Sequence, residues 1–131
     1  MAPVRLATAS DVMAIVDDVE ALRAAVGGPV PVDRAWTAQS VARLIASPDG
    51  AVWVSQGGFI AACLVQTVIS PVFICQEAGW WARDGSGVRL LRQFEKWADE
   101  RGAFLKQIST APEGMDMTRL GYRRAELAWV K

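Results

Sequence analysis

Hydrophobic residues recur at two different spacings along the chain, and the spacing changes near residue 50. Over residues 12–26 the apolar positions recur every three or four residues, which predicts an amphipathic helix. The run Gly27-Gly28-Pro29 ends this helix. After a loop over residues 30–36, a shorter helix is predicted to begin with Thr37 as its cap. A short alternating run over residues 4–8 predicts a first strand.

From residue 51 the chain reads as strands joined by tight turns. Residues 51–55, 59–69 and 72–82 are largely apolar, which is typical of strands in a sheet. The turn residues Gln56-Gly57-Gly58 and Ser70-Pro71 separate them. Three strands joined in this way predict an antiparallel meander.

The last third of the chain returns to helical spacing and then alternates again. A helix is predicted from residue 88 to a stop at Gly102, followed by a strand over residues 104–109. One or two helical turns over residues 115–120 and a last strand over residues 122–130 complete the order β-α-α-β-β-β-α-β-α-β. A strand, a crossover helix and a strand make a parallel pair, so the predicted class is α+β, or mixed α/β, with one parallel pair in a mostly antiparallel sheet.

Composition narrows the chemistry. The 131 residues suit one domain, residues 1–131, and 52% apolar against 21% charged residues rules out disorder. Fourteen basic and fourteen acidic residues cancel, which argues against a nucleic-acid partner. The absence of histidine excludes a Ser-His-Asp triad and a histidine zinc site, and two cysteines exclude a four-cysteine site. We therefore expect no metal.

The chain shows no targeting pattern. Its longest apolar stretch is shorter than the roughly 20 residues of a membrane span. The N-terminus lacks a basic region followed by an apolar core, as a signal peptide would have. We expect a cytoplasmic protein with no membrane partner.

The junction between residues 80 and 91 carries the strongest chemical signal. A predicted strand runs into Arg83-Asp84-Gly85-Ser86-Gly87 and then into a helix. Unpaired N–H groups at a helix N-terminus bind anions, and Arg83 and Arg89 would add charge-assisted contacts. The alternative is a turn whose glycines serve only its geometry. The loop lacks the Gly-Lys-Ser/Thr of a Walker loop and the third glycine of a dinucleotide fingerprint.

In its element order, and above all between Glu77 and Gly102, the chain resembles the GNAT acyltransferase superfamily, most closely its short bacteriophage-encoded members. Those members often carry an acid on the fourth strand, a tryptophan pair, a glycine loop and a helix of the form Leu-Leu-x-x-Phe-Glu-x-Trp-Ala. The corresponding residues here are Glu77, Trp80-Trp81, Gly85-Ser86-Gly87 and Leu90–Ala98, and Leu120–Arg123 resembles the family's Gly-Phe/Tyr entry into the last strands.

The resemblance implies that acetyl-CoA binds as a co-substrate. The pantetheine would lie along the end of the fourth strand, and the pyrophosphate would sit on the amides of the glycine loop. In the family's usual loop the arginine stands one residue farther from the first glycine than Arg83 does. The residues assigned to acetyl-CoA in this way are Trp80, Trp81, Ala82, Arg83, Gly85, Ser86, Gly87, Val88, Arg89 and Thr110.

Acetyl transfer to an amine needs a base, because a protonated amine has no lone pair. Without histidine, a carboxylate is the candidate, and Glu77 interrupts an otherwise uncharged apolar strand. Burial there would raise its pKa toward a useful range. The alternative is that Glu77 faces solvent or pairs with an arginine across the sheet. Trp36 is the candidate wall of an acceptor pocket, although core packing is the default for a tryptophan.

The family's usual general acid is missing. The family places a tyrosine four residues before the Gly-Phe/Tyr pair, and Met117 stands there; Thr110 takes the place of a frequent asparagine. The single tyrosine, Tyr122, belongs to the Gly-Tyr pair and is expected in the core.

Three functions therefore stay open. The first is an N-acetyltransferase acting on an amine of a protein or small molecule. The second is a weak or inactive CoA-binding module that works through protein contacts, and the third is a small interaction domain without a CoA site. A homodimer is also left open, and a bacteriophage member would work in the host cytoplasm.

Overall fold

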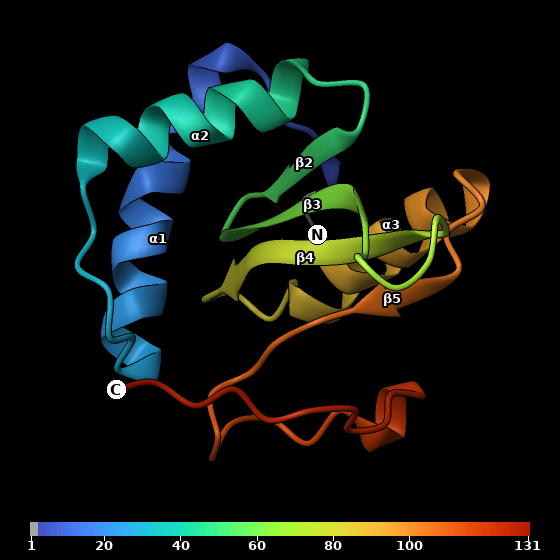
Figure 1. Cartoon of the computed structure of the whole chain (residues 1–131). Helices are drawn as coiled ribbons and strands as arrows, with labels where there is room; N and C mark the ends of the chain where they lie inside the picture. Colours follow the sequence, from blue (N-terminus) through green and yellow to red (C-terminus); the bar gives the residue numbers. More distant parts are fainter. Residues whose placement is uncertain (1–2) are drawn as a thin grey trace.

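In the computed structural model, which describes residues 3–131, helices cover both faces of one twisted sheet (Figure 1). Helices α1 and α2 lie on one face and α3 lies on the other. The elements are β1 (Arg5–Leu6), a 3-10 turn η1 (Ala9–Asp11), α1 (Val12–Val26), α2 (Arg34–Ala46), β2 (Gly50–Ser55), β3 (Gly58–Gln66), β4 (Phe73–Ala82), α3 (Gly87–Glu100), β5 (Leu105–Gln107) and a 3-10 turn η2 (Thr118–Leu120).

The sheet has the strand order β1-β2-β3-β4-β5, and the predicted fold class is confirmed. β1 to β4 pair antiparallel. Gln56 and Gly57 form the tight turn between β2 and β3, and residues 67–72 form the longer loop between β3 and β4. β4 and β5 are parallel, with Ile74 beside Leu105 and Gln76 beside Gln107. The connection through α3 explains this direction, because a crossover helix returns the chain to the same end of the sheet.

Strand alternation sends side chains into two cores. Trp53, Ile60 and Cys75 pack with Leu91 and Phe94 of α3. On the other face, Val52, Val54 and Phe59 pack beneath α1 and α2, with Ile15 and Val41 among their partners. The central strands are buried on both faces, so they read as continuous apolar runs in the sequence.

The cap of the second helix lies four residues earlier than predicted, at Asp33 instead of Thr37. Asp33 caps it: its carboxylate accepts a hydrogen bond from the backbone N–H of Trp36 at 2.9 Å. Thr37 is inside the helix, where its hydroxyl donates to the carbonyl of Asp33 at 2.8 Å. Trp36 is therefore a helical residue, and its expected place in a loop was wrong.

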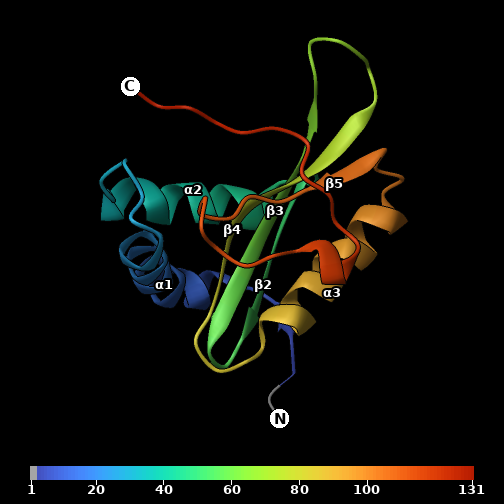
Figure 2. The ribbon, with the colours of Figure 1, turned by 90° about the horizontal axis from the view of Figure 1, so that it is seen from below.

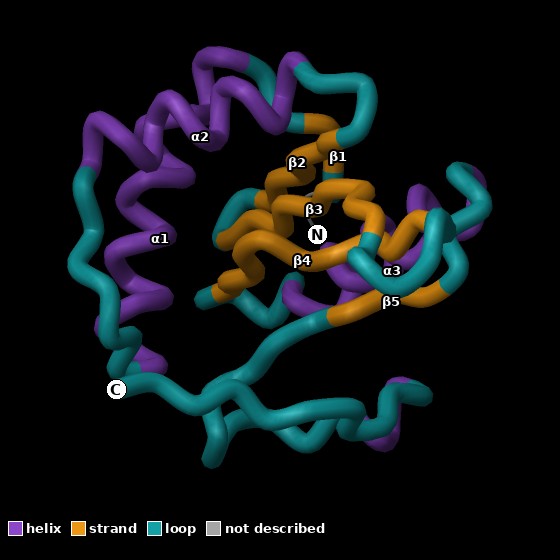
Figure 3. The backbone as a smooth tube through the Cα atoms, viewed as in Figure 1, coloured by secondary structure: helices purple, strands orange, loops and turns teal. Residues whose placement is uncertain are grey.

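The C-terminal region departs furthest from the prediction. The helical turns expected over residues 115–120 are reduced to η2, and residues 122–130 form no strand (Figure 3). Gly121, at φ +90°, ends η2 and turns the chain back beneath the sheet. The alternation of this segment favours a strand, but a strand forms only where an edge pairs with it.

Candidate functional site

The parallel pair β4–β5 is short and then opens. It ends at Gln76 and Gln107, and in the described part of the chain no strand pairs with residues 78–82 on the β5 side. Beyond Gln107 the chain turns away from β4 (Figure 2). The backbone edge of residues 78–82 is thus left open, directly before the glycine loop. An open edge of this kind offers N–H and C=O groups to an extended ligand.

A β-bulge lies at the start of the opening. Ala61 pairs with Gly79 and Ala62 pairs with Glu77, which leaves Ala78 as an extra residue in β4. Because of the extra residue, Trp80 packs on the α3 face and Trp81 packs on the α1–α2 face. The bulge therefore sets which tryptophan approaches the helix that follows the loop.

Glu77 lies where the two strands part. It is half-buried, and its Oε1 accepts a hydrogen bond from the backbone N–H of Ser109 at 3.0 Å. Desolvation raises the pKa of the Glu77 carboxyl, and the Ser109 hydrogen bond opposes that rise. No ion pair to Glu77 forms among the described residues. The expected alternative of a cross-sheet arginine is thus not what the structure shows.

The glycine loop joins the open edge to α3 in one tight turn. Gly85 adopts φ +82°, in the left-handed region that glycine enters at low cost, and α3 begins at Gly87. The indole N–H of Trp80 donates to the carbonyl of Gly87 at 3.1 Å, which ties the strand to the first turn of the helix. The backbone N–H groups of that first turn have no intrahelical acceptor, so they can serve an anion.

A carboxylate already occupies part of this turn. Asp84 Oδ1 accepts from the backbone N–H of Ser86 at 3.0 Å and from its hydroxyl at 2.5 Å. These two bonds hold the pKa of Asp84 below its usual value. Ser86 is fully buried, and its Oγ also lies 2.7 Å from the hydroxyl of Ser55 on β2. The loop is therefore pre-ordered, but with a negative charge where an anion is expected.

Arg83 reaches away from the loop. Its guanidinium forms an ion pair with Asp18 of α1, with Nη1 and Oδ1 2.8 Å apart. Its backbone N–H donates to the carbonyl of Gly57 at 2.9 Å, so only the side chain is free to change direction. A phosphate contact by Arg83 stays a prediction, and it requires the Asp18 pair to open.

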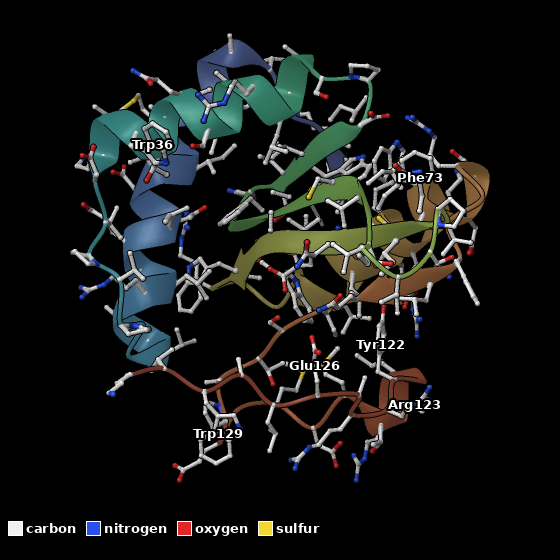
Figure 4. All side chains as sticks on the ribbon, in the orientation of Figure 1. Trp36, Phe73, Tyr122, Arg123, Glu126 and Trp129 are labelled. Carbon is white, nitrogen blue, oxygen red and sulfur yellow. The ribbon has the colours of Figure 1, made fainter. Side chains whose placement is uncertain are left out.

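The remaining predicted residues lie apart from one another. Thr110 is exposed and directly follows Ser109, whose backbone N–H donates to Glu77. Trp36 is exposed on α2, with the guanidinium carbon of Arg43 5.2 Å from its ring centroid. Val88 is exposed in the first turn of α3, and Ala82 packs against the α3-facing core. The structure thus places Glu77 on the strand that leads into the loop. Trp36 lies apart, exposed on α2 (Figure 4).

Met117, at the position of the family's general acid, and Tyr122, the single tyrosine, both have structural roles. Met117 is buried in the α3-facing core. Tyr122 packs against the same core and donates its hydroxyl to Glu95 Oε2 at 2.8 Å, and burial together with Glu95 raises its pKa. A raised pKa keeps the phenol protonated and engaged with Glu95. The expectation that Tyr122 belongs to the core is confirmed.

Sequence reasoning missed three residues of this region. Asp84, Ser55 and Ser109 hold the loop and Glu77 in place. The Asp84-Gly85-Ser86 spacing signals a local turn in which an aspartate accepts from the N–H two residues on. Ser55 and Ser109 gave no signal, because their roles depend on contacts between distant parts of the chain. The state of the Trp81 indole N–H was also not predicted: among the described residues it is the one buried side-chain N–H without a hydrogen-bond partner.

Two surface hollows lie elsewhere, and both are partly open to solvent. One of about 240 Å³ is lined by Asp18, Arg83 and the β2–β3 turn, and one of about 500 Å³ lies between β1 and the end of α3. Neither is lined by Glu77, because the opening beside it is a strand edge rather than a closed pocket. Within residues 3–131 no group of three metal-ligating side chains gathers, and no helix is both long and apolar enough to cross a membrane.

Comparisons with known proteins find similarity in structure only. No protein-family model matches the chain, and no curated protein is significantly similar to it. A predicted acetyltransferase from Clostridium acetobutylicum, crystallised with acetyl-CoA, superposes with a TM-score of 0.82 at 13% identity, over 100% of this chain and 95% of that one.

Two further solved structures are similar over nearly their whole length. An acetyltransferase from Trypanosoma brucei gives a TM-score of 0.73 at 12% identity, over 100% of this chain and 99% of that one. A transcriptional regulator from Bacillus halodurans gives 0.77 at 17% identity over the same shares. At such low identities the likeness establishes architecture rather than activity: the chain has a GNAT-like acetyltransferase fold.

Proposed function

We propose that this protein is an acetyl-CoA-dependent N-acetyltransferase that acts on an amine of a protein or a small molecule. One observation carries the proposal: a half-buried Glu77 lies where β4 and β5 part, and the open edge of β4 leads directly to the glycine loop and the N-terminus of α3. The acetyl-CoA held by the Clostridium acetobutylicum protein of the same fold supports it.

Each part of the proposed site has one role. The open edge of residues 78–82 would hold the pantetheine through backbone hydrogen bonds. The amides of Gly87 and Val88 would meet the pyrophosphate, since both stand in the first turn of α3. Gly85, Ser86, Trp80 and Trp81 would shape the turn. Arg83 and Arg89 would contact the phosphates, Arg83 only after its pair with Asp18 opens. Thr110, which follows Ser109, would meet acetyl-CoA at the Glu77 end of the site. Trp36 would bound the acceptor region only at its outer margin.

Glu77 would act as the general base. It accepts a proton from the incoming ammonium, directly or through water, and so frees the nitrogen lone pair. Acetyl-CoA supplies the thioester carbon with which that nitrogen forms the new amide bond. The carbon–sulfur bond breaks, the nitrogen gives up its second proton to solvent, and the departing thiolate takes a proton from solvent, because neither Met117 nor Tyr122 is placed to supply one.

The runner-up is a CoA-binding module with weak or no catalysis, which acts by binding a protein. Three observations favour it. Met117 is buried where the family's acid is expected, the Asp84 carboxylate holds the Ser86 amide, and Arg83 is paired with Asp18. Each weakens either proton delivery or anion binding.

Binding of acetyl-CoA tests both readings at once. Calorimetric titration should give saturable binding, and ligand at 100 times its dissociation constant should add about 2.7 kcal/mol to the free energy of unfolding. Absence of heat and of any thermal shift at millimolar acetyl-CoA would remove the enzyme and the binding module together.

Catalysis is tested by single-turnover transfer to a panel of amines with Glu77→Gln. The variant should bind acetyl-CoA normally and transfer about 10²–10⁴ times more slowly. Glu100→Gln, a change of the same chemistry at the exposed end of α3, should leave the rate unchanged. Because the pKa of Glu77 is raised above 4.5, the wild-type rate should increase with pH through an apparent pKa above that value. Equal rates for both variants would assign Glu77 a structural role.

The setting of the reaction belongs to the same proposal. The sequence motifs between Glu77 and Gly102 resemble those of short bacteriophage-encoded acyltransferases. A protein of that kind would work in the host cytoplasm. No nucleic acid and no membrane takes part in the proposed reaction.

A further inference from the structure

An apolar surface lies exposed at one end of the sheet, and we call it the hairpin patch. It covers the tip of the β3–β4 hairpin and the start of β5, and it consists of Val68, Ile69, Val72, Phe73, Phe104 and Leu105. Val68 is 104% exposed and Ile69 is 89% exposed. The backbone N–H of Phe104 donates to the carbonyl of Phe73 at 2.8 Å, so the two parts adjoin. Contiguous exposed apolar surface marks an interaction site.

The C-terminal segment, residues 122–130, carries the second exposed apolar surface. Leu127, Trp129 and Val130 are all exposed, and Trp129 is 87% exposed. The segment alternates like a strand, so Leu127 and Trp129 would share one face of an extended chain. It pairs with no strand of the described sheet.

Within one chain of this structure the two surfaces lie apart. Gln107 Nε2 donates to Glu126 Oε1 at 3.4 Å, so residue 126 lies beside the last residue of β5. The hairpin patch lies at the other end of β5, and after Glu126 the chain runs on toward α1 (Figure 1). Figure 4 accordingly shows Phe73 and Trp129 well apart.

β5 offers the complementary feature. It is the last strand of the sheet, and its outer edge has no strand partner among residues 3–131. An open edge bears unpaired N–H and C=O groups and accepts a further strand. The edge begins at Leu105, inside the hairpin patch, so a strand added there would bury its apolar face against the patch.

We propose that two copies of this chain exchange their C-terminal segments. Residues 123–130 of each copy pair with the outer edge of β5 of the other, while Tyr122 stays packed against its own Glu95. Leu127 and Trp129 cover the partner's hairpin patch. Each copy gives one strand and accepts one, so a two-fold arrangement closes on itself. The exchange extends each sheet by one strand and removes both exposed apolar surfaces from water. It does not depend on acetyl-CoA.

Light scattering after size-exclusion chromatography measures the assembly. The wild type should run at about twice the 14.2 kDa of one chain and dissociate on dilution. Trp129→Glu and Ile69→Glu, one on each surface, should each give a single chain with an unchanged circular-dichroism spectrum. Val30→Glu, an equally drastic change at an exposed residue outside both surfaces, should leave the mass doubled. A wild type of single-chain mass at every concentration overturns the proposal.

Cross-linking separates exchange from pairing within one chain. Leu105→Cys and Trp129→Cys are made on separate chains, mixed and oxidised. A disulfide between the two different chains supports exchange, and the unmodified chain reports any background from Cys63. If a disulfide forms only when both changes sit on one chain, the segment pairs with its own β5 and exchange is excluded. Growth into long open assemblies would likewise exclude the two-fold form.

Discussion

Asp84 places a negative charge at the turn where an anionic ligand is proposed to bind. Its Oδ1 holds the Ser86 N–H that the pyrophosphate would otherwise meet, and its pKa is lowered by the Ser86 hydrogen bonds, so it is charged at neutral pH. At the level of single residues, the Asp84 carboxylate therefore already binds a backbone N–H of the proposed anion site.

Replacing Asp84 tests this occupation. Asp84→Asn keeps an oxygen that can accept from Ser86 but removes the charge, so acetyl-CoA should bind several-fold more tightly. Asp99→Asn, which removes a carboxylate at the far end of α3, is the control and should leave affinity unchanged. Calorimetric titration of both variants measures the difference. Weaker binding by Asp84→Asn would mean that the carboxylate supports the loop more than it repels the ligand.

Tyr122 is a second residue whose role the structure separates from catalysis. Tyr122→Phe removes the hydrogen bond to Glu95 and should lower the free energy of unfolding by about 1 kcal/mol. Urea denaturation measures that loss. Acetyl transfer per folded molecule should not change, and a collapse of transfer in a stable variant would make Tyr122 a participant in the reaction.

At the scale of elements, the β4–loop–α3 unit depends on two glycines in different ways. Gly85 has φ +82° and open space where a Cβ would lie. A side chain there would therefore be disfavoured by the backbone conformation and not by a clash. Gly87 has an ordinary helical conformation, and a Cβ there would lie 3.7 Å from the Ala82 Cβ, an ordinary contact. The loop thus needs glycine at 85 for folding, whereas the fold itself does not require glycine at 87.

Two alanine variants distinguish these needs. Gly85→Ala should lower the free energy of unfolding by about 1–2 kcal/mol, the cost of a left-handed conformation for a residue with a side chain. Gly87→Ala should not destabilise the protein. Thermal unfolding of both proteins measures the contrast. Equal melting temperatures would show that the turn at Gly85 relaxes at little cost.

At the scale of the whole molecule, Asp11 couples the sheet edge to the first helix. Arg5 on β1 and the backbone N–H of Thr8 bind its carboxylate, and the hydrogen bond from Arg5 is the main cause that lowers its pKa to about 2. A lowered pKa stabilises the fold above the ordinary value of 3.8, and that contribution disappears as the pH falls toward about 2.

Acid unfolding should therefore depend on Asp11. The melting temperature of the wild type should decline as the pH falls from 3.8 toward about 2, and Asp11→Asn should decline less over that interval. Arg5→Gln should flatten the curve in the same way, since it removes the main partner. Parallel curves for all three proteins would show that other carboxylates control acid unfolding. Glu77 acts in the opposite direction, because a raised pKa favours the fold at low pH.

Much of the fold was predictable because its signals are local. Helical spacing marked α1 and α3, and the turn signals Gln56-Gly57-Gly58 and Ser70-Pro71 marked the meander, although β3 ends at Gln66, three residues before the expected end. The same local reading placed Glu77 on β4 and the glycine loop before α3. The start of α2 was predicted wrongly, because Asp33 and Thr37 are both good N-cap residues. Asp33 is the residue that caps the helix, by accepting a hydrogen bond from the backbone N–H of Trp36.

The remaining features of the site depend on contacts between residues that are far apart in the chain. The bulge at Ala78 that sorts Trp80 from Trp81, the Ser109 N–H on Glu77 and the turn of Arg83 toward Asp18 have no local signal. The C-terminal strand shows the limit most clearly. Residues 122–130 have the pattern of a strand, but alternation determines only which side chains would share a face. Whether a strand forms depends on an edge to pair with, and that edge belongs to the folded molecule rather than to the segment.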